Sequence, residues 1–188
     1  MSWRDRLLEI HETPWRPVST AALVGASIAI VLILWAANTG DRWVWILDNA
    51  NLAFHEAGHP LLGMVSSRLA VYGGTLGQLA FPIATTIGFW SRRHPASFAL
   101  CAVWIAQNLF NVAVYMADAR ALQLPLVGGL DPELAHDWNE IFSRWGLLRS
   151  DTTIAFLVRM LAWAGVLAAW GWLGWRWWRG REDEWGPE

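Results

Sequence analysis

The sequence contains no lysine and a single cysteine, Cys101. All 14 basic residues are arginine, which we attribute to genomic composition and not to mechanism. One cysteine excludes both a disulfide within the chain and a metal site built from several thiolates. Sixteen acidic residues bring the formal net charge to −2, and no basic run occurs. Nothing in the sequence therefore supports binding to nucleic acid.

Charged residues are also scarce, at 16%, whereas hydrophobic residues make up 55% of the chain and the mean hydropathy is +0.27. This composition is too apolar for an ordinary soluble domain and is typical of a membrane protein. The 16 tryptophans cluster near the ends of apolar stretches, where an amphipathic indole suits the membrane–water interface. We therefore expect an integral, multi-pass protein whose main partner is the lipid bilayer.

Five apolar stretches are long enough to cross a bilayer as helices, namely 18–37, 43–65, 69–90, 96–117 and 152–175. They predict an all-α, polytopic bundle of about five transmembrane helices. A polar N-terminal segment, 1–17, precedes this membrane-embedded domain, 18–175. The charged C-terminal tail, 176–188, is expected to be disordered. The excess of arginine before the first stretch predicts a cytoplasmic N-terminus.

One long polar loop, 120–150, separates the fourth and fifth stretches. It contains a helix-start signal, in which Asp131 can cap and Pro132 can occupy the first helical position. An amphipathic pattern follows as far as Trp145. The loop therefore predicts one short helix at the membrane interface.

The second apolar stretch carries His55-Glu56-Ala57-Gly58-His59. On a helix, residues four apart share a face, so both imidazoles can reach one metal ion. Glu56 can then act as general base toward a water molecule, as in HExxH zinc hydrolases. The alternative is a chance pattern of ordinary polar contacts. We favour the metal site, expected near mid-bilayer, because ionisable groups in a membrane are costly unless paired or bound to metal.

A stripe of polar residues follows one face of the fourth stretch, at steps of three, four and three: Asn108, Asn111, Tyr115 and Asp118. Polar groups aligned in this way should face the interior of a membrane bundle. They either bind neighbouring helices by hydrogen bonds or face the metal-binding helix, and we favour the second interpretation. Asn108 or Asn111 could then stabilise an oxyanion or hold an extended substrate.

The HExxH helix resembles the zinc helix of the site-2 protease family of intramembrane metallopeptidases. The chain resembles more closely a set of uncharacterised bacterial membrane proteins grouped loosely with that clan. The matching blocks are 54–59, 73–79, 117–121, 124–126 and 136–138. This resemblance implies a zinc peptidase in the bacterial inner membrane, with a membrane protein or peptide as substrate.

The family's third zinc ligand, an aspartate followed by glycine, has no counterpart here, because Asp131 is followed by Pro132. Catalytic zinc still requires three protein ligands and one open position. The candidates are Asp118, Asp131, His136 and Asp137. His136 is the first choice, because a third imidazole matches the other two and Asp137 could orient it. Asp118 is the second.

The leading hypothesis is a membrane-embedded zinc-dependent hydrolase, most simply a peptidase, with Glu56 as base and His55 and His59 as ligands. The alternative is a non-catalytic membrane protein with a structural metal site, or with a role in transport or partner binding. Glu56 distinguishes the two, because a structural site has no need of an unliganded glutamate. The sequence specifies neither the substrate nor the oligomeric state.

Overall fold

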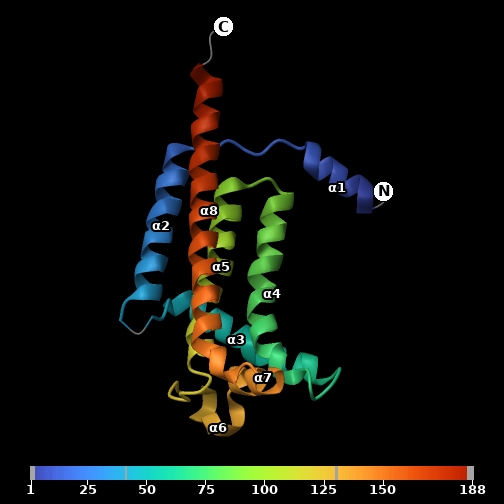
Figure 1. The fold of residues 1–188 in the computed structure, drawn as a ribbon. Coiled ribbons are helices and arrows are strands. Elements are labelled where there is room, and N and C mark those ends of the chain that lie inside the picture. The colour runs from blue at the N-terminus through green and yellow to red at the C-terminus, as the bar shows by residue number, and fades with distance from the viewer. Residues whose placement is uncertain (1–2, 41, 130, 186–188) are drawn as a thin grey trace.

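The computed structural model describes residues 3–40, 42–129 and 131–185, and the described chain is helical with no strand (Figure 1). The all-α fold class is therefore confirmed. The helices are α1 (Trp3–Glu12), α2 (Thr20–Asn38), α3 (Trp45–Gly63), α4 (Ala70–Ser91), α5 (Pro95–Ala117), α6 (Pro132–Ala135), α7 (Asp137–Trp145) and α8 (Asp151–Trp185). Two short 3₁₀ turns, η1 (Val127–Gly129) and η2 (Leu148–Ser150), lie between them.

Three segments of the described chain are long and apolar enough to cross a membrane: Thr20–Asn38, Pro95–Ala117 and Leu148–Arg181. They correspond to α2, α5 and α8 and agree with the first, fourth and fifth predicted stretches to within a few residues, except that α8 continues further. The helices α3 and α4 are not among them. The described residues thus provide three candidate spans, in place of the five predicted.

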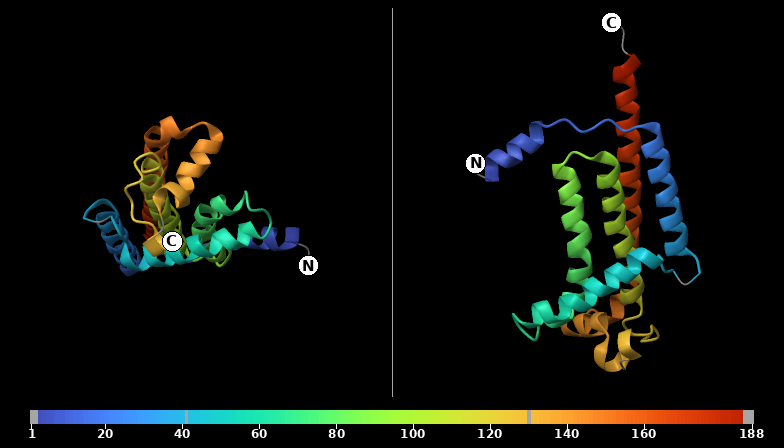
Figure 2. Two further views of the ribbon diagram at one scale, coloured as in Figure 1. Left: turned by 90° about the horizontal axis from the view of Figure 1, so that it is seen from below. Right: turned by 180° about the vertical axis from the view of Figure 1, so that it is seen from behind.

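Figures 1 and 2 show α2, α4, α5 and α8 running alongside one another, while α3 lies across one end of this group. We call this the α3 end; there α2 and α5 end and α4 and α8 begin. The expectation that the motif helix crosses the membrane and holds its motif at mid-bilayer does not agree with this arrangement. The physical reason is composition, because six polar or ionisable residues between 48 and 59 make α3 too polar for a lipid-facing span.

The helix α5 is the centre of the bundle. Ile30 of α2, Phe110 of α5 and Val166 of α8 are fully buried in one apolar cluster. Small residues allow α5 and α8 to approach closely, since a Cβ atom at Gly165 would lie 3.3 Å from the Cβ of Ala106. Close packing of small residues is a main source of helix association in membranes, where lipid tails are as apolar as the protein.

The short amphipathic helix predicted in the polar loop is present, but it is divided into α6 and α7. Its apolar residues Trp138, Ile141 and Phe142 pack at the α3 end. The division occurs at His136, whose backbone is extended and whose Nδ1 accepts a hydrogen bond from the N–H of Asn139 at 3.1 Å. His136 therefore caps α7 and does not continue a single helix from Pro132.

The helices α3 and α4 meet through glycine. A Cβ atom at Gly58 would lie 1.9 Å from the carbonyl oxygen of Gly73, and one at Gly77 would lie 2.3 Å from the carbonyl oxygen of Phe54. The two backbones can touch only because these positions lack side chains. The glycines of the 73–79 block thus serve close helix packing, and they place α4 directly beside the HExxH motif.

The expectation of a disordered C-terminal tail is wrong as far as Trp185, because α8 continues to that residue. Its 35 residues span about 50 Å, well beyond the roughly 30 Å of a hydrocarbon core. Arginine and glutamate are good helix formers, so a charged composition does not by itself end a helix. Residues 186–188 of the predicted tail lie outside the described residues. Within the polar segment 1–17, the structure adds α1.

The position of α3 predicts the membrane sidedness of the loops on either side of it. Single cysteines at Arg42 and Arg68, in a Cys101→Ala background, should react with a membrane-impermeant maleimide from the same side. A cysteine at Arg92, at the opposite end of the bundle, should react from the other side. Labelling of positions 42 and 68 from opposite sides would mean that α3 crosses the bilayer.

Candidate metal centre

Two histidines of α3 and one aspartate of α7 form a cluster of ligand-type atoms. The Nε2 atom of His55 lies 3.0 Å from Oδ2 of Asp137, and Nε2 of His59 lies 3.4 Å from the same oxygen. One ligand atom from each of the three residues falls within 4.8 Å of the others. The predicted pair His55 and His59 thus shares a site, and Asp137 is the residue that completes it.

Acceptor groups of α4 form hydrogen bonds with the Nδ1 atoms of both imidazoles. Nδ1 of His55 is 2.8 Å from Oε1 of Gln78, and Nδ1 of His59 is 2.9 Å from the carbonyl oxygen of Ala70. Since both partners are acceptors, each Nδ1 carries a proton, and in the neutral form of each ring the Nε2 lone pair is directed at the cluster. Oxygen acceptors behind metal-binding histidines commonly set the tautomer and the ring orientation in this way.

Gly74 of α4 provides the space in which the two rings meet. A Cβ atom at this position would lie 2.4 Å from Nε2 of His55 and 2.8 Å from Nε2 of His59. Any side chain here would occupy the volume between the ligand atoms. The predicted 73–79 block therefore contributes two functions to the centre, room at Gly74 and orientation at Gln78.

Asp137 begins α7 and is buried. Its backbone N–H donates to the hydroxyl oxygen of Tyr115 at 3.0 Å, which ties the start of α7 to the last turn of α5. Its Oδ2 is buried and lacks a partner with hydrogen-bond geometry, although both imidazoles lie close. A buried carboxylate oxygen in this condition is a favourable ligand for a cation.

The charges of the cluster are coupled. Burial acts to raise the pKa of Asp137, but contacts with His55 and His59 outweigh it, so the net shift of the pKa is downward. Asp137 in turn raises the pKa of His59 to about 9. Without a metal the carboxylate is therefore stabilised by a protonated imidazole. A bound cation would take the place of that proton, which is the usual coupling of metal and proton binding.

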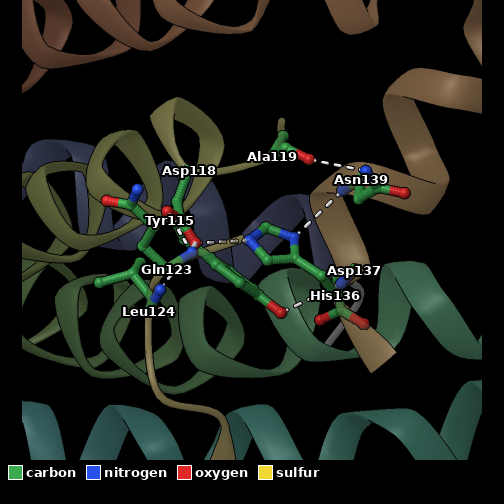
Figure 3. A network of polar contacts seen from close by, with 8 residues as sticks. All are labelled: Tyr115, Asp118, Ala119, Gln123, Leu124, His136, Asp137 and Asn139. Atoms are coloured by element: carbon green, nitrogen blue, oxygen red, sulfur yellow. Dashed lines mark hydrogen bonds and ion pairs between the residues drawn. The ribbon is translucent and has the colours of Figure 1, made fainter. Parts of the chain in front are cut away.

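His136 and Asp118, the two residues expected first as third ligand, form a separate pair next to the cluster (Figure 3). Nε2 of His136 lies 3.3 Å from Oδ2 of Asp118, and its Nδ1 is engaged as the cap of α7. Burial lowers the pKa of His136, which favours the neutral ring.

The Asp118 member of this pair is also bound to the backbone. The Asp118 carboxylate accepts hydrogen bonds from the N–H groups of Gln123 and Leu124, at 2.9 and 3.0 Å. Asp118 thus has other partners, and Nε2 of His136, which has no hydrogen bond, lies next to Asp118 and outside the cluster of ligand atoms. The geometry therefore favours Asp137, which was expected to orient His136, as the third ligand. Asp131 is an exposed residue outside the cluster.

Asn108 and Asn111 face α3, as the polar stripe predicts, but they lie away from the histidines. Asn108 donates to Oδ1 of Asn51 at 3.0 Å, and Asn111 donates to the carboxylate of Asp48. Asp48 and Asn51 precede His55 by seven and four residues, so this contact is one to two turns from the ligands. The two asparagines hold α3 across the end of α5, and neither touches the metal centre.

Three residues of this buried network, Asp48, Asn51 and Gln107, were not singled out from the sequence. The Asp48 carboxylate also accepts from Gln107, and Oε1 of Gln107 accepts from Asn51 at 3.0 Å. Asp48 lies two turns from His55 on the same face of α3, and Gln107 directly precedes the stripe. Those spacings were the available signal, but a pairing between separate helices becomes visible only in the fold.

Glu56 differs from the three ligand-type residues in its exposure to solvent. It is exposed, and among the described residues it has no hydrogen-bond or ion-pair partner. The negative charge of Glu56 nevertheless interacts electrostatically with His59 and Tyr115 across the centre. Chemically, the arrangement offers two ring nitrogens and one carboxylate oxygen to a cation, with a second, unliganded carboxylate beside them.

The room at Gly74 can be tested directly. Gly74→Ala should displace the imidazoles and strongly reduce metal binding, because its methyl group falls within 2.8 Å of both Nε2 atoms. Gly88→Ala on the same helix is the matched control, since nothing lies within 4 Å of its Cβ position. Metal content and thermal unfolding of both variants in detergent provide the measurement. Full metal content in Gly74→Ala would contradict the proposed ligand geometry.

Comparison with known proteins adds no family assignment. No protein-family model matches the chain, and no curated protein or solved structure matches it either. Function is therefore inferred from the geometry of the centre.

Proposed function

We propose that this protein is a membrane-embedded zinc-dependent hydrolase, most simply a peptidase. The observation that carries the proposal is the convergence of both HExxH histidines on one carboxylate from another helix, at 3.0 and 3.4 Å. Two imidazole nitrogens and one carboxylate oxygen, with a fourth position open, form a ligand set typical of catalytic zinc.

Two of the three spacings between the ligand atoms are compatible with zinc. Zinc binds nitrogen and oxygen at about 2.0–2.2 Å in tetrahedral geometry, so adjacent ligand atoms are separated by roughly 3.3–3.5 Å. The distances from Asp137 Oδ2 to the two Nε2 atoms are close to this separation. An ion here would also satisfy Oδ2 of Asp137, which has no hydrogen bond. The set of ligands therefore fits the metal that the HExxH motif predicts.

In this proposal His55, His59 and Asp137 would hold zinc, which when bound would polarise a substrate carbonyl and lower the pKa of a water molecule. Glu56 accepts the proton of the attacking water. Its exposure and lack of a described partner leave its carboxylate available for that task. Gln78 and Ala70 orient the imidazoles, so that little movement of the rings accompanies binding.

The proposed setting is an integral, multi-pass protein of the bacterial inner membrane. We propose four crossing helices, α2, α4, α5 and α8, with α4 included because it runs alongside α5 (Figure 2). Both ends of the described chain then lie on one face. Eight arginines belong to that face, at 4, 6, 16, 92, 93, 176, 179 and 181, against five at the α3 end, at 42, 68, 120, 144 and 149, so the excess of positive charge favours the cytoplasm for that face.

On this topology α3 lies in the plane of the opposite membrane face. Its outward residues are apolar, and Ile46, Leu61 and Met64 are among the exposed hydrophobic side chains. Such a face suits contact with acyl chains near the headgroups. Glu56 lies on the exposed side of the same helix. We therefore propose a substrate peptide bond close to the membrane surface, in a membrane protein or membrane-bound peptide.

The identity of the third ligand is tested by metal analysis. Asp137→Ala should lose most of its zinc, as His55→Ala and His59→Ala should, because three protein ligands are needed to hold a catalytic ion. Asp118→Ala and His136→Ala should retain most of it. Elemental analysis of the purified variants gives zinc per chain. Retention of zinc in Asp137→Ala together with its loss in His136→Ala would restore the assignment expected from the sequence.

Glu56→Gln separates a hydrolase from a structural metal site. The substitution preserves size but removes the base, so zinc should stay bound while hydrolysis falls by about a hundredfold to ten-thousandfold. Cells carrying the variant should accumulate an uncleaved membrane substrate, detectable by quantitative proteomics of their membranes. Glu140→Gln is the control, since Glu140 is exposed and paired with Arg144 at 2.7 Å. An unchanged membrane proteome would favour the non-catalytic alternative.

A further inference from the structure

We infer that Tyr115 is a catalytic residue of the proposed hydrolase, whose hydroxyl group donates a hydrogen bond to the substrate carbonyl oxygen as negative charge develops there. The inference rests on the proposed function and adds a second charge-stabilising group to it. It also replaces an expectation, because Asn108 and Asn111 were the candidates for this role.

Tyr115 lies where the three elements of the centre meet. It belongs to the last turn of α5, its ring centroid is 6.1 Å from that of His55, and it is 4.2 Å from that of His136. Its hydroxyl oxygen is 3.0 Å from the backbone nitrogen of Asp137, the proposed third ligand. Figure 3 shows the phenol group of Tyr115 beside His136 and Asp137.

The hydroxyl proton of Tyr115 is uncommitted. A phenol has one proton to donate, and the N–H of Asp137 uses an oxygen lone pair and not that proton. No hydrogen bond in the described structure has this hydroxyl as donor. The nearest ring, His136, is engaged at Nδ1 by Asn139 and faces Asp118 with Nε2. The proton can therefore be offered to a substrate.

Three other donors on α5 and beyond it have partners already. Asn108 and Asn111 are bound to Asn51 and Asp48 of α3. The guanidinium of Arg120 is paired with Asp151, at 2.7 Å. The hydroxyl of Tyr115 differs from these three groups, because it adjoins the proposed third ligand and no described hydrogen bond uses its proton.

Hydrolysis in this proposal consists of the addition of water and the later departure of the amine. Water adds to the carbonyl carbon while its proton passes to Glu56, and the electron pair of the C=O bond moves onto oxygen. The hydroxyl of Tyr115 donates to that oxygen and remains protonated. When the C–N bond breaks, the carbonyl re-forms and the proton on Glu56 passes to the leaving amine. A donor fixed in place before the reaction is effective because it needs no reorganisation as the charge appears.

Tyr115→Phe removes the donor and keeps the ring. The test uses the full-length protein in detergent, loaded with Co²⁺, whose visible absorbance reports on the ligands of the site. Acetohydroxamate is the probe, because its anionic oxygens imitate the developing charge. In Tyr115→Phe, Co²⁺ affinity should stay within about twofold of wild type. The dissociation constant of acetohydroxamate should rise about ten- to a hundredfold, as expected for a lost hydrogen bond to a charged group.

Tyr72→Phe is the matched control, since Tyr72 packs against Trp145 and its hydroxyl accepts from that indole at 3.2 Å. It should change neither affinity. Equal acetohydroxamate binding by wild type and Tyr115→Phe would overturn the inference while leaving the metal centre intact. A large loss of Co²⁺ affinity in Tyr115→Phe would overturn it too, by making Tyr115 a support for Asp137. Failure of the wild type to bind Co²⁺ would remove the proposed function itself.

Discussion

The contact between the carboxylate of Asp137 and the imidazoles of His55 and His59 is the interaction on which the rest of the centre depends. It joins α7 to α3, with Oδ2 of Asp137 at 3.0 Å from Nε2 of His55 and 3.4 Å from Nε2 of His59. In the sequence, α4 and α5 lie between these two helices. Two groups of α4 support this contact, because Gln78 and the backbone of Ala70 orient the rings. Without it, two buried ionisable groups, His55 and Asp137, and the half-buried His59 would lack compensation.

The same constraint explains why α3 lies across the bundle end. A helix that carries Asp48, Asn51 and His55 on one face cannot present that face to lipid. It turns these residues inward, where Asn108 and Asn111 of α5 bind Asn51 and Asp48 and where His55 meets Gln78 and Asp137. Its apolar outer face remains exposed. The glycine contacts with α4 then bring the two backbones together over the motif. The polar network and the metal centre thus both provide partners for the polar face of α3, which would otherwise be buried without compensation.

Local patterns predicted much of this structure. The helical class, the bounds of α2 and α5 and the His55–His59 pair all follow from hydropathy and from the helical period, which act over neighbouring residues. Asn108 and Asn111 of the polar stripe face α3, as expected, whereas Asp118 at its end is bound to the backbone of the following loop and lies next to His136. The amphipathic pattern to Trp145 indicated α7. However, it could not reveal that His136 would cap α7 and divide the predicted helix, because that depends on a competition between backbone and side-chain hydrogen bonds.

The sequence by itself determined that the chain is helical, that it is apolar enough for a membrane, and that Glu56 stands beside two histidines on one helical face. Only the tertiary structure decided that α3 crosses the bundle end, that Asp137 and not His136 faces the histidines, and that Tyr115 adjoins them. Each of these depends on how separate helices meet. Adjacent residues at the start of a helix point in different directions, so a rotation of one residue exchanges Asp137 for His136. Packing sets that rotation, and no local pattern contains it.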